Sequence, residues 1–257
     1  MIRIATWNVN SVKARLINLQ RWLMDCSPDI VLLQELKCVD EAFPRLEIEA
    51  LGYNVETVGQ KTYNGVAILS KFPIDVELRA LPGDDSDMQA RYLEAFTGSV
   101  RVASIYLPNG NPYPGEKFDY KLKWMERLYT HALGLLQGED AFVLGGDYNV
   151  IPQAGDVYSP EAFKNDALYQ LESQAALRKT LNLGLTDAFR AITSETGLYS
   201  WWGYMAGGWP KDHGVLIDHL LLSPQAADRL KDCQIDRNPR GWDKPSDHTP
   251  VWCDLED

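Results

Sequence analysis

Short runs of aliphatic and β-branched residues recur along the chain and alternate with segments of helical periodicity. Runs of this length and composition are typical of buried strands. They predict strands at residues 2–7, 30–33, 66–69, 100–106, 141–144 and 217–222. Because strands and helices are interspersed over the whole length, the pattern predicts an α/β protein.

Helical patterns occupy some of the intervals between these strands. Apolar residues recur at spacings of three and four over residues 12–24, 118–136 and 171–183, which predicts three helices that each bury one stripe. Asn10 or Ser11 precedes the first of them and is expected to cap its N-terminus.

The chain shows no internal sequence repeat and no linker rich in proline, glycine or serine. A single domain spanning residues 1–257 is therefore the simplest organisation. Clustered prolines and glycines predict loops at residues 107–116 and 237–246, both of which adjoin polar motifs.

Polar side chains follow most of the predicted strands, at the point where each strand ends. These side chains are Asn8, Asn10, Glu35, Tyr106, Asn109, Asp147, Asn149 and Asp218, and the dipeptide Asp247-His248 precedes a further apolar run. Strands that each deliver a carboxylate, amide, phenol or imidazole at one end build a polar site at the rim of a sheet. Loops on a rigid scaffold are where catalytic groups usually lie.

Each of these residues also has a simpler structural explanation. The asparagines could cap the first helix, and Glu35 could be a solvated charge at a strand end. The segment around Asp147 could be a tight turn with local side-chain hydrogen bonds, and Asp247-His248 could be an isolated ion-paired turn. The occurrence of all of them together, in this order, favours a functional site.

Composition and charge narrow the class of protein. Apolar residues make up 45% and charged residues 24%, which is typical of a globular chain rather than a disordered one. No apolar run is long enough to cross a bilayer, and the polar residues near position 8 argue against an export signal. The four cysteines are widely spaced, which predicts reduced thiols in a cytoplasmic protein and argues against a zinc site.

The polar motifs and their order resemble the exonuclease III family of bacterial abasic-site endonucleases, within the endonuclease/exonuclease/phosphatase superfamily. The resemblance covers essentially the full chain. Its motifs are Thr6-Trp7-Asn8-Val9-Asn10, Leu33-Gln34-Glu35-Leu36-Lys37, Asn64-Gly65-Val66, Tyr106-Leu107-Pro108-Asn109, Gly146-Asp147-Tyr148-Asn149, Ile217-Asp218-His219 and Ser246-Asp247-His248.

This resemblance implies a four-layer sandwich, in which two mixed β-sheets pack face to face with helices outside. It implies a monomeric Mg²⁺-dependent DNA repair nuclease, with Mn²⁺ as a possible substitute. The expected substrate is duplex DNA with abasic sites or 3′-blocked ends, and the expected activities are abasic-site incision, 3′→5′ exonuclease and 3′-phosphatase.

The resemblance also assigns roles to individual residues. Asp147 is expected to deprotonate the attacking water, and Asn149 to hold Asp147 and contact a phosphate oxygen. His248, oriented by Asp218, is expected to bind the scissile phosphate, and Tyr106 to stabilise developing charge. The expected further contacts with the DNA backbone are Asn109, Lys117 and Lys121.

Phosphodiester hydrolysis is helped by Mg²⁺, which prefers one or two carboxylates together with water and substrate oxygens. Glu35 is the natural first ligand, and Asp247 is a candidate second ligand. Asn8 and Asn10 can hold metal-bound water or a ligand carboxylate. Acyl transfer at a G-x-S-x-G serine and phosphoryl transfer at a P-loop are excluded, because neither motif occurs.

Two other functions remain open at this point. A member of the superfamily could act on lipid head groups or inositol phosphates, and a chain that had lost a catalytic group could be a binding module. Near the expected abasic pocket, Trp201 is either a pocket wall or a core residue, and Trp202 is expected to be structural. Trp209 or Trp242 could touch DNA.

Two departures from the family pattern affect the expected binding of the metal ion and of DNA. Eukaryotic relatives often carry Asp at the position of Asn10, so metal binding by the first motif is expected to be weaker here. Many relatives carry a basic residue where this chain has Leu216. Together with a net charge of −11, this predicts few phosphate contacts and a shallow salt dependence.

Overall fold

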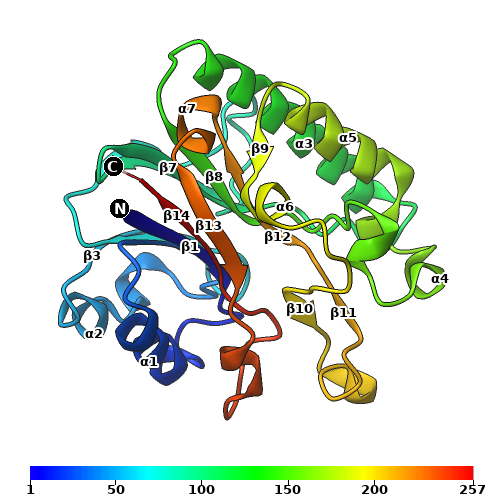
Figure 1. Ribbon diagram of the computed structural model, residues 1–257, viewed down its shortest axis with the longest axis horizontal. Coiled ribbons are helices and arrows are strands. Elements are labelled where there is room, and N and C mark those ends of the chain that lie inside the picture. Colours follow the sequence, from blue (N-terminus) through cyan, green and yellow to red (C-terminus); the bar gives the residue numbers. More distant parts are fainter. Residues whose placement is uncertain (257) are drawn as a thin grey trace.

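Two six-stranded mixed sheets form the centre of the protein, for which a computed structural model describes residues 1–256 (Figure 1). The first, sheet A, contains in spatial order β13 (Leu230–Ile235), β14 (Val251–Leu255), β1 (Ile2–Asn8), β2 (Ile30–Gln34), β4 (Val66–Ser70) and β3 (Asn54–Val58). The second, sheet B, contains β5 (Asp75–Leu78), β6 (Tyr92–Thr97), β7 (Val100–Tyr106), β8 (Phe142–Asp147), β12 (Asp218–Leu222) and β9 (Thr186–Asp187). A separate two-stranded ribbon joins β10 (Trp201–Trp202) to β11 (Gly214–Val215).

Helices cover the outer face of each sheet. Figure 1 shows α1 and α2 beside sheet A, and α3 and α5 beside sheet B. The α-helices are α1 (Leu16–Cys26), α2 (Arg45–Glu49), α3 (Glu116–Leu136), α4 (Pro160–Phe163), α5 (Leu171–Leu181), α6 (Ala188–Ile192) and α7 (Pro224–Ala227). The 3₁₀ helices are η1 (Asp40–Ala42), η2 (Ala154–Asp156), η3 (Ala167–Tyr169), η4 (Met205–Gly207) and η5 (Asn238–Gly241). The predicted four-layer sandwich is confirmed.

The two-residue alternation of each strand divides its side chains between two apolar layers. In β1, Ile4 packs between the sheets, whereas Trp7 packs outward against α1. In β8, Val143 faces the other sheet and Leu144 faces α3. Strands that are apolar on both faces read as continuous apolar runs, which is why the sequence showed them clearly.

The face between the sheets changes from apolar to polar toward one end. Beyond Ile4, the same face of sheet A carries Thr6, whose hydroxyl donates to Gln34 Oε1 (3.2 Å). Gln34 Nε2 in turn donates to Ser104 Oγ in sheet B (3.1 Å). The next residues along β1 and β8 on this face are Asn8 and Asp147, so the packing of the sheets brings the polar strand ends together.

Strand pairing fixes the register of these ends. Asn8 of β1 lies beside Gln34 of the parallel β2, which places Glu35 immediately beyond it. In sheet B, Asp147 pairs with Tyr106 of the parallel β7 and with Asp218 of the antiparallel β12. Three residues from separate motifs are therefore neighbours at one end of sheet B.

Several predicted boundaries were wrong. The first helix begins at Leu16 rather than near residue 12, because residues 12–15 form turns and Arg15 (φ −113°, ψ 13°) lies outside the helical region. The cap position is Arg15, which makes no capping side-chain bond, so neither Asn10 nor Ser11 caps the helix. The strand predicted at 141–144 continues to Asp147. Within residues 1–256, no helix has both the length and the apolar character needed to span a bilayer.

Candidate active site

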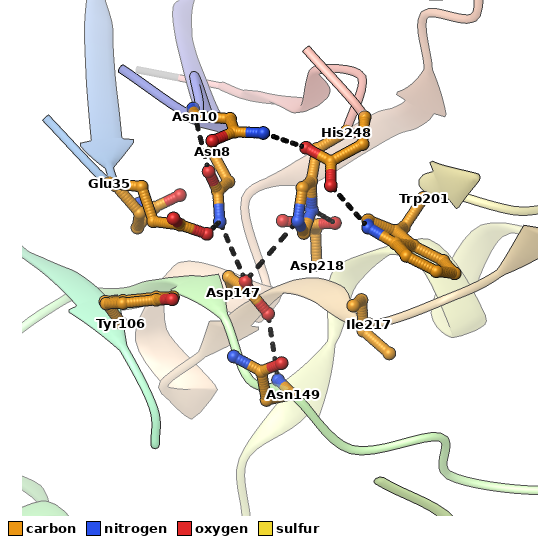
Figure 2. Close-up of polar contacts among 12 residues, drawn as sticks. Asn8, Asn10, Glu35, Tyr106, Asp147, Asn149, Trp201, Ile217, Asp218 and His248 are labelled. Carbon is orange, nitrogen blue, oxygen red and sulfur yellow. Dashed lines mark hydrogen bonds and ion pairs between the residues drawn. The ribbon is translucent and has the colours of Figure 1, made fainter. Parts of the chain in front are cut away.

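Side chains from both sheets converge where the polar strand ends meet (Figure 2). Glu35, Asp147 and His248 each place one potential ligand atom within 4.8 Å of the others, and no other group of His, Cys, Asp or Glu in residues 1–256 does so with three members. Glu35 comes from the end of β2, Asp147 from the end of β8, and His248 from the segment before β14. The predicted meeting of these distant motifs is observed.

Asn8 holds the two carboxylates together. Its Nδ2 donates to Glu35 Oε1 (2.8 Å) and to Asp147 Oδ2 (2.9 Å), and its Oδ1 accepts a bond from the backbone N–H of Asn10 (3.0 Å). The Asn8 side chain is fully buried, so these bonds are shielded from water. Asn8 therefore orients carboxylates, one of the two roles expected for it.

A buried Asp–His–Asp arrangement lies next to this bridge. His248 Nδ1 is 2.9 Å from Asp218 Oδ2, and His248 Nε2 is 3.6 Å from Asp147 Oδ2. Ser200 Oγ donates to the same Asp218 oxygen (2.6 Å). Asp218 thus fixes the orientation of the imidazole, and Nε2 points toward Asp147.

Burial and the neighbouring charges shift the pKa values of this group. Burial, reinforced by Asp218 and Glu35, raises the pKa of Asp147 to about 7, against the opposing effects of His248 and Asn8. Burial by itself would lower the pKa of His248, but Asp218 and Asp147 outweigh it and raise this pKa to about 10. Near neutral pH the imidazole is therefore cationic, and Asp147 can exchange a proton.

Asn149 supports Asp147 from the other side. Its backbone N–H donates to Asp147 Oδ1 (2.9 Å), and Asn149 itself adopts a left-handed backbone conformation (φ 46°). Its side chain donates to the carbonyl of Leu107 (2.9 Å) and accepts from Asn109 Nδ2 (3.1 Å). Strained backbone of this kind is held only where surrounding contacts compensate for it. The expectation that Asn149 holds Asp147 fits this geometry, and Asn109 is exposed beside it.

Lys121 is a correction to the predicted DNA contacts. Its side chain is completely buried, and Nζ donates to the carbonyls of Asn109 (3.1 Å), Asn149 (2.5 Å) and Ala167 (3.5 Å). Burial lowers the pKa of this ammonium to about 7, although Asp166 and Asp147 oppose the shift. Lys121 braces the loops that carry Asn109 and Asn149 and cannot reach a DNA backbone, whereas Lys117 is exposed.

Tyr106, at the end of β7, is half-buried, and its hydroxyl lies toward the carboxylates of Glu35 and Asp147 (Figure 2). Burial, Glu35 and Asp147 all raise the pKa of the phenol well above its ordinary value. The hydroxyl therefore stays protonated and can donate a hydrogen bond to an anionic group. This agrees with the expected stabilisation of developing charge.

The oxygens around Glu35 fit a hard divalent cation. Glu35 is half-buried and presents a carboxylate beside Asp147, the donor type that Mg²⁺ prefers. Lys37 Nζ lies 2.8 Å from Glu35 Oε2 and also donates to Asn10 Oδ1, which shows that these oxygens attract a cation. The expected ligand Glu35 and its neighbour Asn10 are thus placed together.

Asp247 does not join Glu35 as the second carboxylate. Its Oδ1 accepts from Asn10 Nδ2 (2.9 Å), its Oδ2 accepts from Trp201 Nε1 (3.0 Å), and it lies outside the cluster of Glu35, Asp147 and His248. The carboxylate that the structure sets beside Glu35 is that of Asp147. The sequence pointed to Asp247 because it adjoins His248, but adjacent residues on an extended segment point to opposite sides.

Comparison with known proteins assigns the chain to a family. Residues 5–248 match the endonuclease/exonuclease/phosphatase family. The chain is 32% identical to exodeoxyribonuclease III of Haemophilus influenzae, over 99% of this chain and 100% of that protein.

The chain belongs to the endonuclease/exonuclease/phosphatase family.

Two solved structures extend this similarity to the fold. An AP endonuclease from Archaeoglobus fulgidus superposes with a TM-score of 0.95 at 35% identity, and each chain is covered in full. A Neisseria 3′ phosphatase bound to a product DNA hairpin superposes with a TM-score of 0.96 at 36% identity, again over the full length of both chains. As a member of the exonuclease III branch of this family, the chain is a hydrolytic nuclease.

The aromatic side chains of this family member separate into two kinds. Trp202 is fully buried, and its Nε1 donates to Asp212 Oδ1 (2.9 Å), which confirms a structural role. Trp201 is half-buried and bonded to Asp247 at the rim of the site. Trp209 and Trp242 are half-buried, with arginine guanidinium groups stacked on their rings.

Three residues of the site were not identified from the sequence as functional. Lys37 lies within a motif quoted above and Ser200 adjoins Trp201, but neither carried an assigned role, although both bond directly to a site carboxylate. Arg91 packs on the ring of Tyr106, and no motif marked it. The burial of Lys121 did carry a signal, because it lies three residues after Phe118 and four before Met125, on the buried stripe of α3.

Proposed function

We propose that this protein is a Mg²⁺-dependent DNA repair nuclease, which hydrolyses phosphodiesters at abasic sites and removes 3′-blocking groups and 3′-terminal nucleotides from duplex DNA. The observation that carries the proposal is the convergence of Glu35, Asp147 and His248 around the amide of Asn8. The complex of the Neisseria 3′ phosphatase with a DNA hairpin supports DNA as the substrate.

Asp147 is the proposed base that accepts the proton of the attacking water. Both of its oxygens are oriented, one by the amide of Asn8 and the other by the backbone N–H of Asn149. A base that is fixed in position, with a pKa of about 7, is suited to proton transfer at neutral pH.

His248 and Tyr106 are proposed to stabilise the charge that builds up on the phosphate. The cationic imidazole, held by Asp218, presents Nε2 to a non-bridging oxygen, and the Tyr106 hydroxyl donates to the developing anion. Asn109 and Asn149 are proposed to contact the phosphate through amide N–H groups.

Glu35 would hold the proposed divalent cation, and Asn8 and Asn10 would orient its carboxylate. The cation would neutralise charge on the scissile phosphate. Because Asn10 is neutral, Glu35 supplies the charge on this side, and we propose Mg²⁺ with Mn²⁺ as a substitute.

The distribution of unpaired basic residues supports DNA binding despite the net charge of −11. Several accessible lysines and arginines have no carboxylate within 4.0 Å in the described chain and lie at the site end of the sheets, on connections or on the first turn of α3. They are Lys13, Arg15, Lys61, Arg91, Lys117, Lys211 and Lys244, whereas the similarly unpaired Lys123, Arg178 and Arg229 lie elsewhere. A locally basic rim attracts phosphates even on an acidic protein.

The loop between β10 and β11 is proposed to contact DNA beside the lesion. Met205 is 84% exposed and Tyr204 is 49% exposed, unusually high values for large apolar side chains. The Tyr204 hydroxyl donates to the carbonyl of Pro245 (2.9 Å) and accepts from Arg15 (3.0 Å), so the loop is held at the rim. Apolar side chains in such places unstack bases, and Trp201 lies behind them as a proposed wall of the abasic pocket.

The decisive experiment incubates the purified protein with a duplex that contains one abasic site and with a 3′-phosphate duplex, with Mg²⁺ or with EDTA. Incision that requires the metal is expected on both. Sphingomyelin and inositol phosphates are assayed in parallel. Turnover of these compounds without cleavage of either duplex would replace the proposal with a lipid or inositol phosphate hydrolase.

We further propose that the protein acts as a monomer in the cytoplasm. The proposed catalytic groups all come from one chain, and the four cysteines are free thiols, as expected in a reducing compartment. Analytical ultracentrifugation with and without DNA tests the oligomeric state.

A further inference from the structure

Arg91 lies against the proposed catalytic phenol. Its guanidinium carbon is 4.8 Å from the centroid of the Tyr106 ring, and its Nη1 donates to the Tyr106 carbonyl (3.2 Å). The backbone N–H of Tyr106 donates in return to the Arg91 carbonyl (2.9 Å). Three separate contacts therefore join these two residues, one of them through the aromatic ring.

The other side of the guanidinium is anchored by a neutral partner. Arg91 Nε donates to Gln89 Oε1 (2.8 Å), which also accepts from Asn64 Nδ2 (3.3 Å). Among residues 1–256, no carboxylate lies within the 4.0 Å of Arg91 that would define an ion pair, in contrast to Arg79, which pairs with Glu56. The charge of Arg91 is thus held in place without being neutralised.

This placement matters because the phenol faces two anions. The carboxylates of Glu35 and Asp147 both act on the Tyr106 hydroxyl, and the guanidinium of Arg91 opposes them. A cation over the face of an aromatic ring is attracted by the ring quadrupole, which favours one ring position. A free tyrosine side chain would otherwise rotate among several rotamers.

We propose that Arg91 is a positioning residue for Tyr106, which holds the ring so that its hydroxyl faces Asp147 and the scissile phosphate. The inference rests on the proposed function, in which Tyr106 stabilises the phosphate. In this role Arg91 adds its charge to the basic rim but acts on the reaction through Tyr106, and not through a direct phosphate contact.

A double-mutant cycle separates the two roles. Arg91→Met, Tyr106→Phe and the double variant are compared by kcat on an abasic duplex with saturating Mg²⁺. Arg91→Met is expected to lower kcat by about three- to thirtyfold, the range of a cation–π contact. The double variant is expected to be no slower than Tyr106→Phe, because no hydroxyl remains to be positioned. Losses that multiply, with a salt slope for DNA binding reduced by about 0.9, would show a direct phosphate contact and overturn the proposal.

A second measurement does not depend on catalysis. In protein labelled with 3-fluorotyrosine, the ¹⁹F resonance of Tyr106 is the one that Tyr106→Phe removes. It is expected to shift in Arg91→Met and to stay in place in Arg79→Met, a matched control because Arg79 also donates to a backbone carbonyl, that of Thr57 (3.1 Å). A resonance unmoved by Arg91→Met would overturn the positioning role. A wild type inactive on both duplexes would overturn the proposed function, and the resonance would still decide the role of Arg91.

Discussion

β12 contributes one residue to each of two histidine–aspartate pairs. The pairs lie on opposite faces of this strand, and only one of them faces the site. His248 bonds to Asp218 (2.9 Å), and His219, the next residue along β12, bonds to Asp187 (2.9 Å). Both imidazoles are buried, and in both pairs the carboxylate raises the pKa of the imidazole against the effect of burial. Bond length, burial and protonation therefore do not distinguish them.

Their surroundings do distinguish them. The imidazole of His248 lies within 4.8 Å of the carboxylates of Asp147 and Glu35. On the opposite face of β12, Asp187 caps α6 by accepting the backbone N–H groups of Phe189 and Arg190, so its pair with His219 secures a helix. A buried His–Asp pair is thus a structural device unless a third reactive group faces its free nitrogen.

The largest difference in kcat is expected between variants of Asp147, which faces the site, and of Asp187, which faces away from it. Asp147→Asn is expected to fold normally and to lose about 10²–10⁴-fold in kcat, because it removes the proposed base but keeps the hydrogen-bonding shape. Asp187→Asn, the matched control, is expected to keep its kcat. Circular dichroism verifies folding, and an active Asp147→Asn enzyme would remove Asp147 from the mechanism.

The two histidines provide the second contrast. His248→Leu is expected to lower kcat by about 10²-fold, the loss associated with one charge-stabilising donor. His219→Leu is expected to leave kcat unchanged and to lower the free energy of unfolding by about 1–3 kcal/mol, because Asp187 loses its buried partner. Urea denaturation and steady-state kinetics on both variants measure the two effects, and equal losses of kcat would make the contrast invalid.

Lys121 is a structural residue that holds the loops near the end of β8. Lys121→Met is expected to lower the free energy of unfolding by about 1–3 kcal/mol, since three buried carbonyls lose their donor. Lys117→Met, four residues earlier on the exposed surface, is expected to leave this free energy unchanged. Thermal denaturation of both variants provides the measurement, and equal stability would contradict the bracing role.

The pH dependence of stability sharpens the comparison. The pair lowers the pKa of Asp187 and raises that of His219, so it stabilises fully above the unfolded aspartate pKa of about 3.9 and below the unfolded histidine pKa of about 6.5. The stability difference between wild type and His219→Leu is expected to be largest in that window and to shrink as pH rises through the raised histidine pKa. The loss of stability in His248→Leu is expected to persist to about pH 10, because the pKa of His248 is raised to about 10. A difference that grew with pH would contradict this linkage.

The smallest expected effect concerns the rim. If Lys117 contacts one phosphate, Lys117→Met reduces the slope of log affinity against log salt by about 0.9. Lys123→Met, which removes an unpaired lysine elsewhere on α3, is expected to leave the slope unchanged. Fluorescence anisotropy with labelled abasic duplex at several salt concentrations measures both slopes.

Sequence reasoning located most of the candidate site because its residues follow strands that are apolar on both faces. Glu35, Asp147 and Asp218 each lie at or just beyond a strand end, and the family motifs supported their joint role. It failed where a side chain's direction decides its role, as with Lys121, which points into the core, and Asp247, which bonds to Asn10 and Trp201.

The sequence by itself determined six of the fourteen strands described in residues 1–256, the long helices and the chemical groups at the strand ends, because local periodicity and composition encode these. Only the tertiary structure decided that Asp147 rather than Asp247 lies beside Glu35, and that the side chain of Lys121 points into the core. These outcomes depend on how two sheets pack across their shared apolar layer, which sets distances of a few ångströms between residues far apart in the chain. No local pattern carries that information.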